Sequence, residues 1–299
     1  MRWLELSARV DAEAVEAVSE VFSRVAPGGV AIEPEIREVS DEAVVSGPSA
    51  VVRAYIPLDE QAGERQRVVA EGLWHLRAIW PVGDLEAREI AEDDWSAAWK
   101  RHYRTFRVGR RLVIRPSWLD DAPRPGDVVV TIDPGSAFGT GLHPTTRRCL
   151  ALLEEVVHPG ADVLDVGTGS GILALAAAAL GARHIVATDI DPIAVETARA
   201  NVRASGAEER IQVLAGSVEA VPPGELYDIV VANIIARVIL ELAPALRARL
   251  RPGGSLIAGG IIADRADEVA GRLTDLGLCL RRFTDGDWIT LLGRWPGTS

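Results

Sequence analysis

The sequence predicts an α/β protein in two parts, a small α+β domain followed by a larger domain built on a doubly wound parallel sheet. Three observations support this prediction. The chain has 299 residues, which is more than one typical domain. Its first ninety residues predict two helices among four strands, and from about residue 116 onward single strands alternate with helices. Such alternation is typical of parallel sheets that carry helices on both faces.

Six elements in the order βαββαβ are predicted in the first ninety residues. Alternating apolar residues predict strands, and apolar residues at helical spacing predict helices. The strands are expected at residues 3–10, 30–36, 50–56 and 85–90, and the helices at 12–25 and 60–79. This order is that of a ferredoxin-like split β-α-β unit. No catalytic cluster is evident in these residues, so we expect them to form a hydrophobic core and an exposed docking surface.

A short helix is predicted where the two parts meet, at residues 93–101. Two acidic residues begin this segment and two basic residues end it, which suits the helix macrodipole. Trp95 and Trp99 are four residues apart and therefore lie on one face of the helix. Either they pin the linker helix against a domain, or they contact the substrate.

Five strands of a parallel sheet are predicted in the second part. They are expected at residues 163–166, 185–188, 211–214, 229–232 and 255–258, with helices in the gaps, among them 146–157 and 172–180. Near the C-terminus, residues 279–283 and 288–292 flank a short polar turn and predict a hairpin. We therefore expect helices on both faces of the sheet and an antiparallel edge.

Composition and charge argue against several classes of protein. A net charge of −11 disfavours broad nucleic-acid binding and suits a basic partner. No stretch reaches the roughly 18 apolar residues of a membrane span, and the N-terminus lacks the apolar core of a signal peptide. Cys149 and Cys279 have neither metal-binding nor redox spacing. We expect a cytoplasmic protein with reduced thiols that binds no metal, no membrane and no nucleic acid.

The most informative segment is an apolar strand that carries Asp165 and continues into a turn with Gly167, Gly169 and Gly171. Glycines in such a turn let the backbone approach a charged ligand. A dinucleotide-binding fingerprint needs its third glycine one residue later, where an isoleucine stands. The next strand ends at Asp189, whose carboxylate can accept hydrogen bonds from ribose hydroxyls. This spacing resembles the S-adenosylmethionine site of Rossmann-like methyltransferases. A tight turn without a ligand and a nicotinamide site are the alternatives.

Residues at the ends of the next three strands are further candidates. Asp191 is expected to cap the following helix. Ser217 and Val218 follow the third strand, where such folds contact adenine, unless this is an ordinary turn. Asn233 closes the fourth strand, and its side chain either accepts an incoming N–H group through the amide oxygen or caps the helix near residue 236. If the first and fourth strands are neighbours, Gly167 and Asn233 face each other where the strand order reverses, which is where ligands bind in doubly wound sheets.

The glycine-rich segment 133–146 is the other unusual stretch. Loops of this composition can act as lids, so we expect Phe138, Gly139, Thr140 and His143 to cover the ligand. Thr145 either caps the helix that follows or turns its hydroxyl toward the cofactor. His143 is more typical of a hydrogen-bonding brace than of a proton carrier.

Four segments together, residues 133–146, 165–171, 189–192 and 233–236, resemble the ribosomal protein L-eleven methyltransferases. The same family is matched by three shorter features: the pairs Asp94-Trp95 and Trp99-Lys100, the run Pro116-Ser117-Trp118, and Asp287-Trp288 near the C-terminus. The likeness is strong over residues 93–299, and over the first ninety residues it rests on the βαββαβ order. One departure is mild: Ile235 replaces a leucine that the family commonly has.

The resemblance implies a particular architecture and cofactor. Residues 116–299 would form a Rossmann-like, seven-stranded class I methyltransferase domain, residues 91–115 a linker with a helix, and residues 1–90 a ferredoxin-like substrate-recognition domain. The implied cofactor is S-adenosyl-L-methionine. The family's donor contacts correspond to Thr145, Gly167, Asp189 and Asn233, and the strand and turn residues add the candidates Asp165, Gly169, Gly171, Ser217 and Val218.

The resemblance also implies the reaction. Methyl groups would be transferred to amino groups, either lysine side chains or the N-terminal α-amine, of ribosomal protein L-eleven. Asn233 would position the amine, and no general base is assigned. We expect the free ribosomal protein to be the substrate and the enzyme to be a monomer.

Other functions stay open at this point. The enzyme can act instead on another protein or on a small-molecule amine. A methyltransferase for glutamine or nucleic-acid bases usually closes the fourth strand with Asn/Asp-Pro-Pro-aromatic, and Ile234 and Ile235 cannot stack a planar group in that way. A non-catalytic ribosome-assembly protein is disfavoured by the complete set of donor residues.

Overall fold

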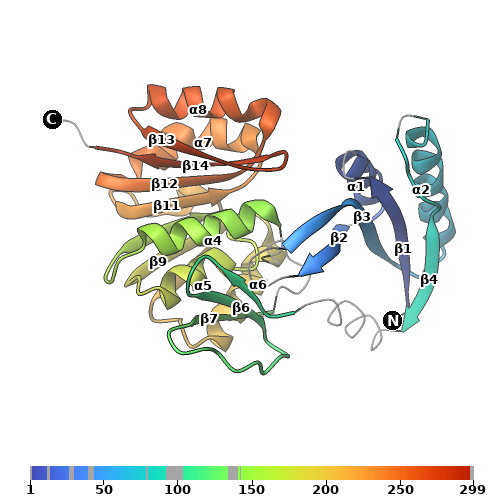
Figure 1. The fold of residues 1–299 in the computed structure, drawn as a ribbon, viewed down its shortest axis with the longest axis horizontal. Coiled ribbons are helices and arrows are strands. Elements are labelled where there is room, and N and C mark those ends of the chain that lie inside the picture. Colours follow the sequence, from blue (N-terminus) through green and yellow to red (C-terminus); the bar gives the residue numbers. More distant parts are fainter. Residues whose placement is uncertain are drawn as a thin grey trace. The chain divides into compact units, whose positions relative to one another are not determined.

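The computed structural model describes residues 2–11, 14–26, 30–39, 44–78, 80–91, 104–133, 141 and 143–296. The chain divides into two compact units, residues 1–103 and 104–299 (Figure 1). The helix expected at 93–101, with Trp95 and Trp99, lies outside the described residues. The same is true of the loop residues Phe138, Gly139 and Thr140.

The first unit confirms the predicted order of elements. Its elements are β1 (Arg2–Asp11), α1 (Val15–Ser23), β2 (Val30–Val39), β3 (Val44–Pro57), α2 (Ala62–Leu76) and β4 (Glu86–Ala91). The four strands form one antiparallel sheet in the order β2-β3-β1-β4, the arrangement of a ferredoxin-like unit. Alternate residues of β1, from Leu4 to Val10, are buried together with Phe22 of α1, so the period of the strand decides which face is packed.

The second unit begins with a three-stranded sheet that the sequence analysis did not anticipate. Its strands are β5 (Phe106–Val108), β6 (Leu112–Pro116) and β7 (Val128–Ile132), in that order across the sheet. The strands are only three to five residues long, which is too short for a clear alternating pattern. Much of β5 and β6 falls in the segment expected to be a linker, yet these strands belong to the second unit.

A seven-stranded sheet forms the centre of the second unit. Its strands are β8 (Asp162–Val166), β9 (His184–Asp189), β10 (Ile211–Ala215), β11 (Tyr227–Asn233), β12 (Leu250–Ile262), β13 (Cys279–Asp285) and β14 (Trp288–Arg294). They lie in the order β10-β9-β8-β11-β12-β14-β13. The predicted hairpin is present, but its reversed strand β14 pairs with β12 and is one position in from the edge, and β13 forms the edge itself. The sheet is thus parallel except for β14.

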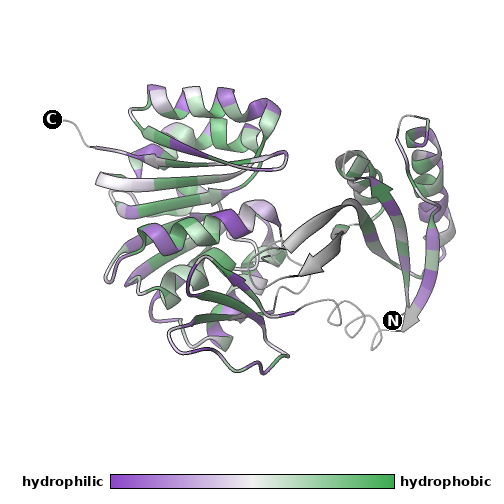
Figure 2. Cartoon of the chain, in the orientation of Figure 1, coloured by the Kyte–Doolittle hydropathy of each residue, from purple (hydrophilic) through white to green (hydrophobic). Residues whose placement is uncertain are grey.

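Helices cover both faces of this sheet, as predicted. They are α4 (Pro144–Val156), α5 (Ile172–Ala179), α6 (Pro192–Ala204), α7 (Ala236–Ala248) and α8 (Ala266–Asp275), with short 3₁₀ turns η3 (Val218–Ala220) and η4 (Ala263–Arg265). One core joins the sheet to α4, α5 and α6, and a second joins it to α7 and α8 (Figure 1). Every residue of β8 is buried. The helix α5 is wholly apolar (Figure 2), as expected for a helix packed into the core between sheet and neighbouring helices.

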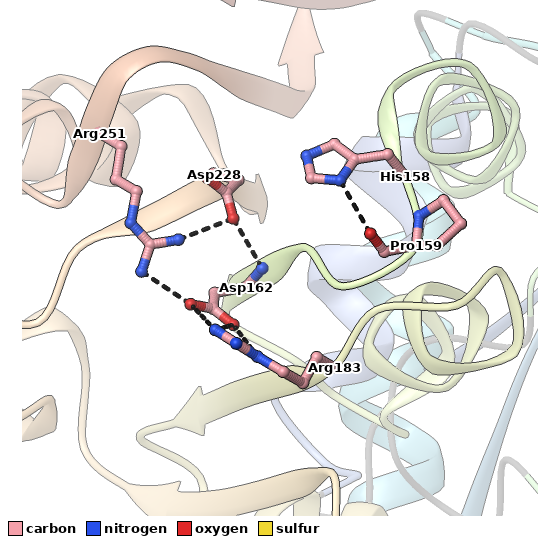
Figure 3. Close-up of polar contacts among 6 residues, drawn as sticks. All are labelled: His158, Pro159, Asp162, Arg183, Asp228 and Arg251. Atoms are coloured by element: carbon pink, nitrogen blue, oxygen red, sulfur yellow. Dashed lines mark hydrogen bonds and ion pairs between the residues drawn. The ribbon is translucent and has the colours of Figure 1, made fainter.

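A charged cluster ties the strands together at their amino ends (Figure 3). Arg251 donates to Asp228 and to Asp162, each over 2.7 Å, and Arg183 also binds Asp162. The N–H of Asp162 donates to Asp228 over 2.9 Å. Burial raises the pKa of Asp162, but the hydrogen bonds from Arg251 and Arg183 outweigh it and hold the pKa below the usual range. Because this cluster lies at the opposite ends of β8 and β11 from the glycine turn, it holds the strand register without occupying the ligand side.

Candidate functional site

The strand order reverses between β8 and β11. Val166 pairs with Ala232, so the next residues, Gly167 and Asn233, leave the sheet side by side. The predicted site depends on the first and fourth strands being adjacent, and this prediction is confirmed. The approach is close, since a Cβ on Gly167 would lie 2.3 Å from Cγ2 of Ile234. In doubly wound sheets this crevice is where ligands bind.

Asp165 is a fully buried carboxylate in β8. Its Oδ2 accepts a hydrogen bond of 2.6 Å from the hydroxyl of Thr168, and its Oδ1 is buried without a partner among the described residues. Burial raises the pKa of Asp165 to about 7. Hydrogen bonding from Thr168 and from the backbone of Ala174 acts against this rise, and the charge of Asp189 adds to it. A buried carboxylate with one unpartnered oxygen costs stability, which is typical of a group kept for binding.

The turn that follows has the backbone conformation that its glycines predict. Gly167, Gly169 and Gly171 have φ of 75°, 56° and 86°, values that residues with a Cβ rarely adopt. Most of its N–H groups are already bonded within the protein: Gly167 and Thr168 donate to the carbonyl of Thr188, Gly169 to Asp189, and Gly171 to Thr168. These four hydrogen bonds hold the shape of the turn.

Asp189 is held rigidly at the end of β9. Its Oδ2 accepts from the N–H of Gly169 over 2.9 Å and its Oδ1 from the N–H of Asp191 over 3.0 Å. Each carboxylate oxygen can accept a second hydrogen bond, so the group can still receive two hydroxyls. Asp191 itself caps α6 by accepting from the N–H of Ile193, which confirms its predicted structural role. Ile190, directly after Asp189, is 80% exposed and offers an apolar surface that the sequence analysis overlooked.

Ser217 and Val218 lie beyond the end of β10. The N–H of Ser217 donates to Oε1 of Glu219 over 3.0 Å. The N–H of Gly216 donates to the carbonyl of Asp189 over 2.8 Å, which brings this segment next to the end of β9. Val218 is buried in the core as a whole residue, and its carbonyl accepts from Arg249, so the structure gives no exposed surface of Val218 for a ligand.

Asn233 ends β11 and does not cap α7, whose N-cap residue is Ile235. Its Nδ2 donates to the hydroxyl of Thr146 over 3.1 Å, and its Oδ1 is buried without a partner in the described part of the chain. Gly259 of β12 makes room for this amide, since a Cβ there would lie 2.6 Å from the Oδ1. The bond to Thr146 therefore leaves the amide oxygen as the group that can accept an N–H. The sequence did not predict Thr146 as the partner of Asn233, because two adjacent threonines begin this helix and the sequence does not show which of them faces β11.

At the start of α4, the prediction that Thr145 caps the helix is wrong, and the alternative that its hydroxyl faces the cofactor stays a prediction. His143 is the N-cap residue, and its Nδ1 accepts from the N–H of Thr145 over 3.3 Å and lies 2.8 Å from the Thr145 hydroxyl. Burial lowers the pKa of His143 to about 4, so the ring is neutral at pH 7. The ring also packs edge-on against Trp288, with centroids 4.8 Å apart. These contacts agree with the prediction that His143 is a brace.

The described residues therefore place Asp165, the glycine turn, Asp189 and Asn233 at the carboxyl ends of adjacent strands. Within the described ranges, no group of three or more His, Cys, Asp or Glu side chains can hold a metal ion. Nor is any helix in those ranges long and apolar enough to cross a membrane. The two cysteines are unpaired, with Cys149 buried and Cys279 exposed.

Comparison with known proteins gives one consistent family. The family model described as Ribosomal protein L11 methyltransferase (PrmA) matches residues 2–295. A ribosomal protein L11 methyltransferase of Chloroflexus aurantiacus is 44% identical over 98% of both chains, and one of Herpetosiphon aurantiacus is 44% identical over 99% of this chain and 100% of its own. The solved structure of a ribosomal protein L11 methylase from Lactobacillus delbrueckii subsp. bulgaricus is 34% identical, with a TM-score of 0.59, and covers 64% of this chain and 100% of that one. By its match over nearly the whole length and by its fold, the chain belongs to the ribosomal protein L11 methyltransferase family.

Proposed function

We propose that this protein transfers methyl groups from S-adenosyl-L-methionine to amino groups of ribosomal protein L11, either lysine side chains or the N-terminal α-amine. The observation that carries the proposal is the pair of unpartnered buried oxygens, Oδ1 of Asp165 and Oδ1 of Asn233, on adjacent strands beside the glycine turn. Membership of the L11 methyltransferase family supports the same reaction.

The residues at this edge of the sheet suit a cationic nucleoside. Asp165 can accept from the donor's ammonium group, and Asp189 keeps capacity for the ribose hydroxyls. Gly167 allows the close approach of Ile234, which a Cβ would block. Thr145, Gly169, Gly171 and Ser217 are the further candidate contacts. Acceptor oxygens and carboxylates favour a sulfonium and an ammonium through simple charge attraction.

The same electrostatics disfavours a nicotinamide dinucleotide. A pyrophosphate needs backbone N–H donors at the glycine turn. Four N–H groups of this turn donate to protein oxygens, and the neighbouring side chains Asp165 and Asp189 are acids. A doubly negative group would meet carboxylates where it requires donors.

S-adenosylmethionine would supply a methyl group on a sulfonium: a neutral amine attacks the methyl carbon, the N–C bond forms as the S–C bond breaks, and the thioether S-adenosylhomocysteine leaves. A lysine of pKa about 10.4 costs about 4.6 kcal/mol to deprotonate at pH 7, whereas an α-amine near 7.8 costs about 1 kcal/mol. Asn233 would accept an N–H of the amine through Oδ1 and so direct its lone pair. His143, with a pKa of about 4, is too weak a base to take a proton from an ammonium group. We assign no general base: burial near a cation lowers the amine's pKa, and water takes the proton. Alignment can then supply up to about 7–11 kcal/mol in favourable cases.

We further propose that the N-terminal part, residues 1–90, recognises the ribosomal protein and that the chain from residue 91 to the start of β5 links it to the catalytic part. The ferredoxin-like unit supports this role, because its buried side chains form a hydrophobic core of their own. The net charge of −11 suits a basic partner such as a ribosomal protein. We propose a monomer that acts on the free ribosomal protein in the cytoplasm.

A methyl-transfer assay tests the proposed function. The full-length protein is incubated with tritiated S-adenosylmethionine and with isolated ribosomal proteins, and the labelled product is mapped by mass spectrometry. Label is expected in ribosomal protein L11, on amino groups. Label on a different protein or on a small amine would show that the substrate is wrong, and no label with intact donor binding would indicate a non-catalytic binder.

A further inference from the structure

Asn201 is a buried amide on the inner face of α6, a surface otherwise made of residues such as Ala198 and Val202. It is 4% exposed and belongs to no group considered so far. A polar side chain in such a place is stable only if its hydrogen bonds are satisfied. Asn201 meets that condition through three hydrogen bonds, and all of them go to the backbone of two distant segments.

The first segment is the end of β7. The N–H of Asp133 donates to Oδ1 of Asn201 over 3.0 Å, and Nδ2 of Asn201 donates to the carbonyl of Asp133 over 2.8 Å. The second segment is the glycine turn, where Nδ2 donates to the carbonyl of Ser170 over 2.9 Å. Since an N–H must face an oxygen and a carbonyl must face an N–H, these backbone groups allow only one orientation of the amide.

The bond to Ser170 sets the last peptide plane of the turn. The N–H of Gly171 belongs to the same peptide group and points the opposite way from the Ser170 carbonyl. It donates to the carbonyl of Thr168 over 2.9 Å. Thr168 in turn donates its hydroxyl to Asp165. A continuous series of hydrogen bonds thus leads from Asn201 to the buried carboxylate assigned to the donor's ammonium group.

We propose that Asn201 is a positioning residue for the donor site, which holds the glycine turn in register with the end of β7. This inference rests on the proposed function, because it takes the turn to be the place where S-adenosylmethionine binds. An apolar residue of similar size would fill the same volume but would remove the hydrogen bonds that Asn201 makes with the N–H of Asp133 and the carbonyl of Ser170. Asn201 touches no reacting atom, so its effect should fall on donor binding and not on recognition of the ribosomal protein.

The test compares Asn201→Leu with Val202→Ala, a substitution of the adjacent residue, which is also buried on α6. Calorimetry with S-adenosylhomocysteine measures donor-site affinity, steady-state assays give KM for each substrate, and thermal unfolding gives stability. Asn201→Leu is expected to weaken S-adenosylhomocysteine binding and raise KM for S-adenosylmethionine by roughly ten- to a hundredfold, with KM for the ribosomal protein unchanged. Val202→Ala should lower Tm and leave both donor constants as they are. Lower Tm with unchanged donor constants in Asn201→Leu would overturn the proposal.

Hydrogen exchange in the unmodified protein keeps the proposal testable if Asn201→Leu does not fold. Addition of S-adenosylhomocysteine is expected to slow exchange of the Asp133 amide, because a turn ordered by ligand holds Asn201 and hence Asp133. An unchanged rate in the saturated protein would contradict the coupling. If the unmodified protein binds no S-adenosylhomocysteine at all, the proposed function fails, and this outcome is distinct from failure of the role of Asn201.

Discussion

Replacing Asp165 with asparagine should stabilise the ligand-free protein and weaken donor binding. The carboxylate is fully buried and its pKa is raised to about 7. Its hydrogen bond from Thr168 can be kept by the amide oxygen of the asparagine, so the substitution mainly removes a buried charge.

The size and the pH dependence of this gain follow from the pKa. In the folded protein Asp165 binds its proton up to about pH 7, whereas in the unfolded chain it releases it near pH 4. The native state therefore binds more protons between these values, and this group lowers stability as pH rises through the interval. The rise from near 4 to about 7 corresponds to ~4 kcal/mol above pH 7, which is an upper limit because the new NH₂ group is buried and must lose its hydration.

Urea unfolding of the unmodified protein and of Asp165→Asn, at several pH values from 4 to 8, measures the difference in unfolding free energy. The gain from the substitution should be small at pH 4, grow to about pH 7 and then level off. The other ionisable groups titrate alike in both proteins, so their contributions cancel in the difference in unfolding free energy. A gain of equal size at all pH values, or a loss that grows with pH, would refute the argument that charge burial sets the effect. Calorimetry should show weaker S-adenosylhomocysteine binding by the same variant, so stability and function change in opposite directions.

Three other predictions concern single contacts. Asp189→Ala should weaken S-adenosylhomocysteine binding about ten- to a hundredfold, since two hydroxyl acceptors are lost, with little effect on KM for the ribosomal protein; unchanged affinity in calorimetry would remove Asp189 from the site. Asn233→Asp keeps an acceptor oxygen and should retain more methyl-transfer activity than Asn233→Ala, and the reverse order in the tritium assay would exclude the amide oxygen as the amine's acceptor. Arg251→Met should destabilise the fold by about 1–3 kcal/mol at pH 7. The pKa of Asp162 is depressed, so the stability it contributes is present above about pH 4 and is lost as pH falls; a loss in urea unfolding that persists undiminished at pH 3 would contradict this role of the cluster.

Much of the fold could be predicted because it depends on patterns within short segments. The buried run of β8, the alternation of β1 and the cap at Asp191 each depend on neighbouring residues, and all were anticipated. The small sheet β5-β6-β7 was missed, since strands of three to five residues carry too few side chains to show a period. The placement of β14 inside the sheet was missed as well, because strand order depends on which partners compete for each edge.

The sequence by itself determined the identity of the site. A carboxylate in the strand before a glycine turn, a second acid after the next strand and an asparagine at the end of the fourth are all visible in the chain, and positive φ at the glycines follows from the missing Cβ. Only the tertiary structure decided which of these groups are available to a ligand. Asn233 bonds to Thr146, 87 residues away in the sequence, and Asn201 bonds to Asp133, 68 residues away. The free amide oxygen of Asn233 and the positioning role of Asn201 therefore arise from contacts between distant segments. The fold decides which donors and acceptors bond to each other. Local sequence therefore cannot predict which of them stay free to bind a ligand.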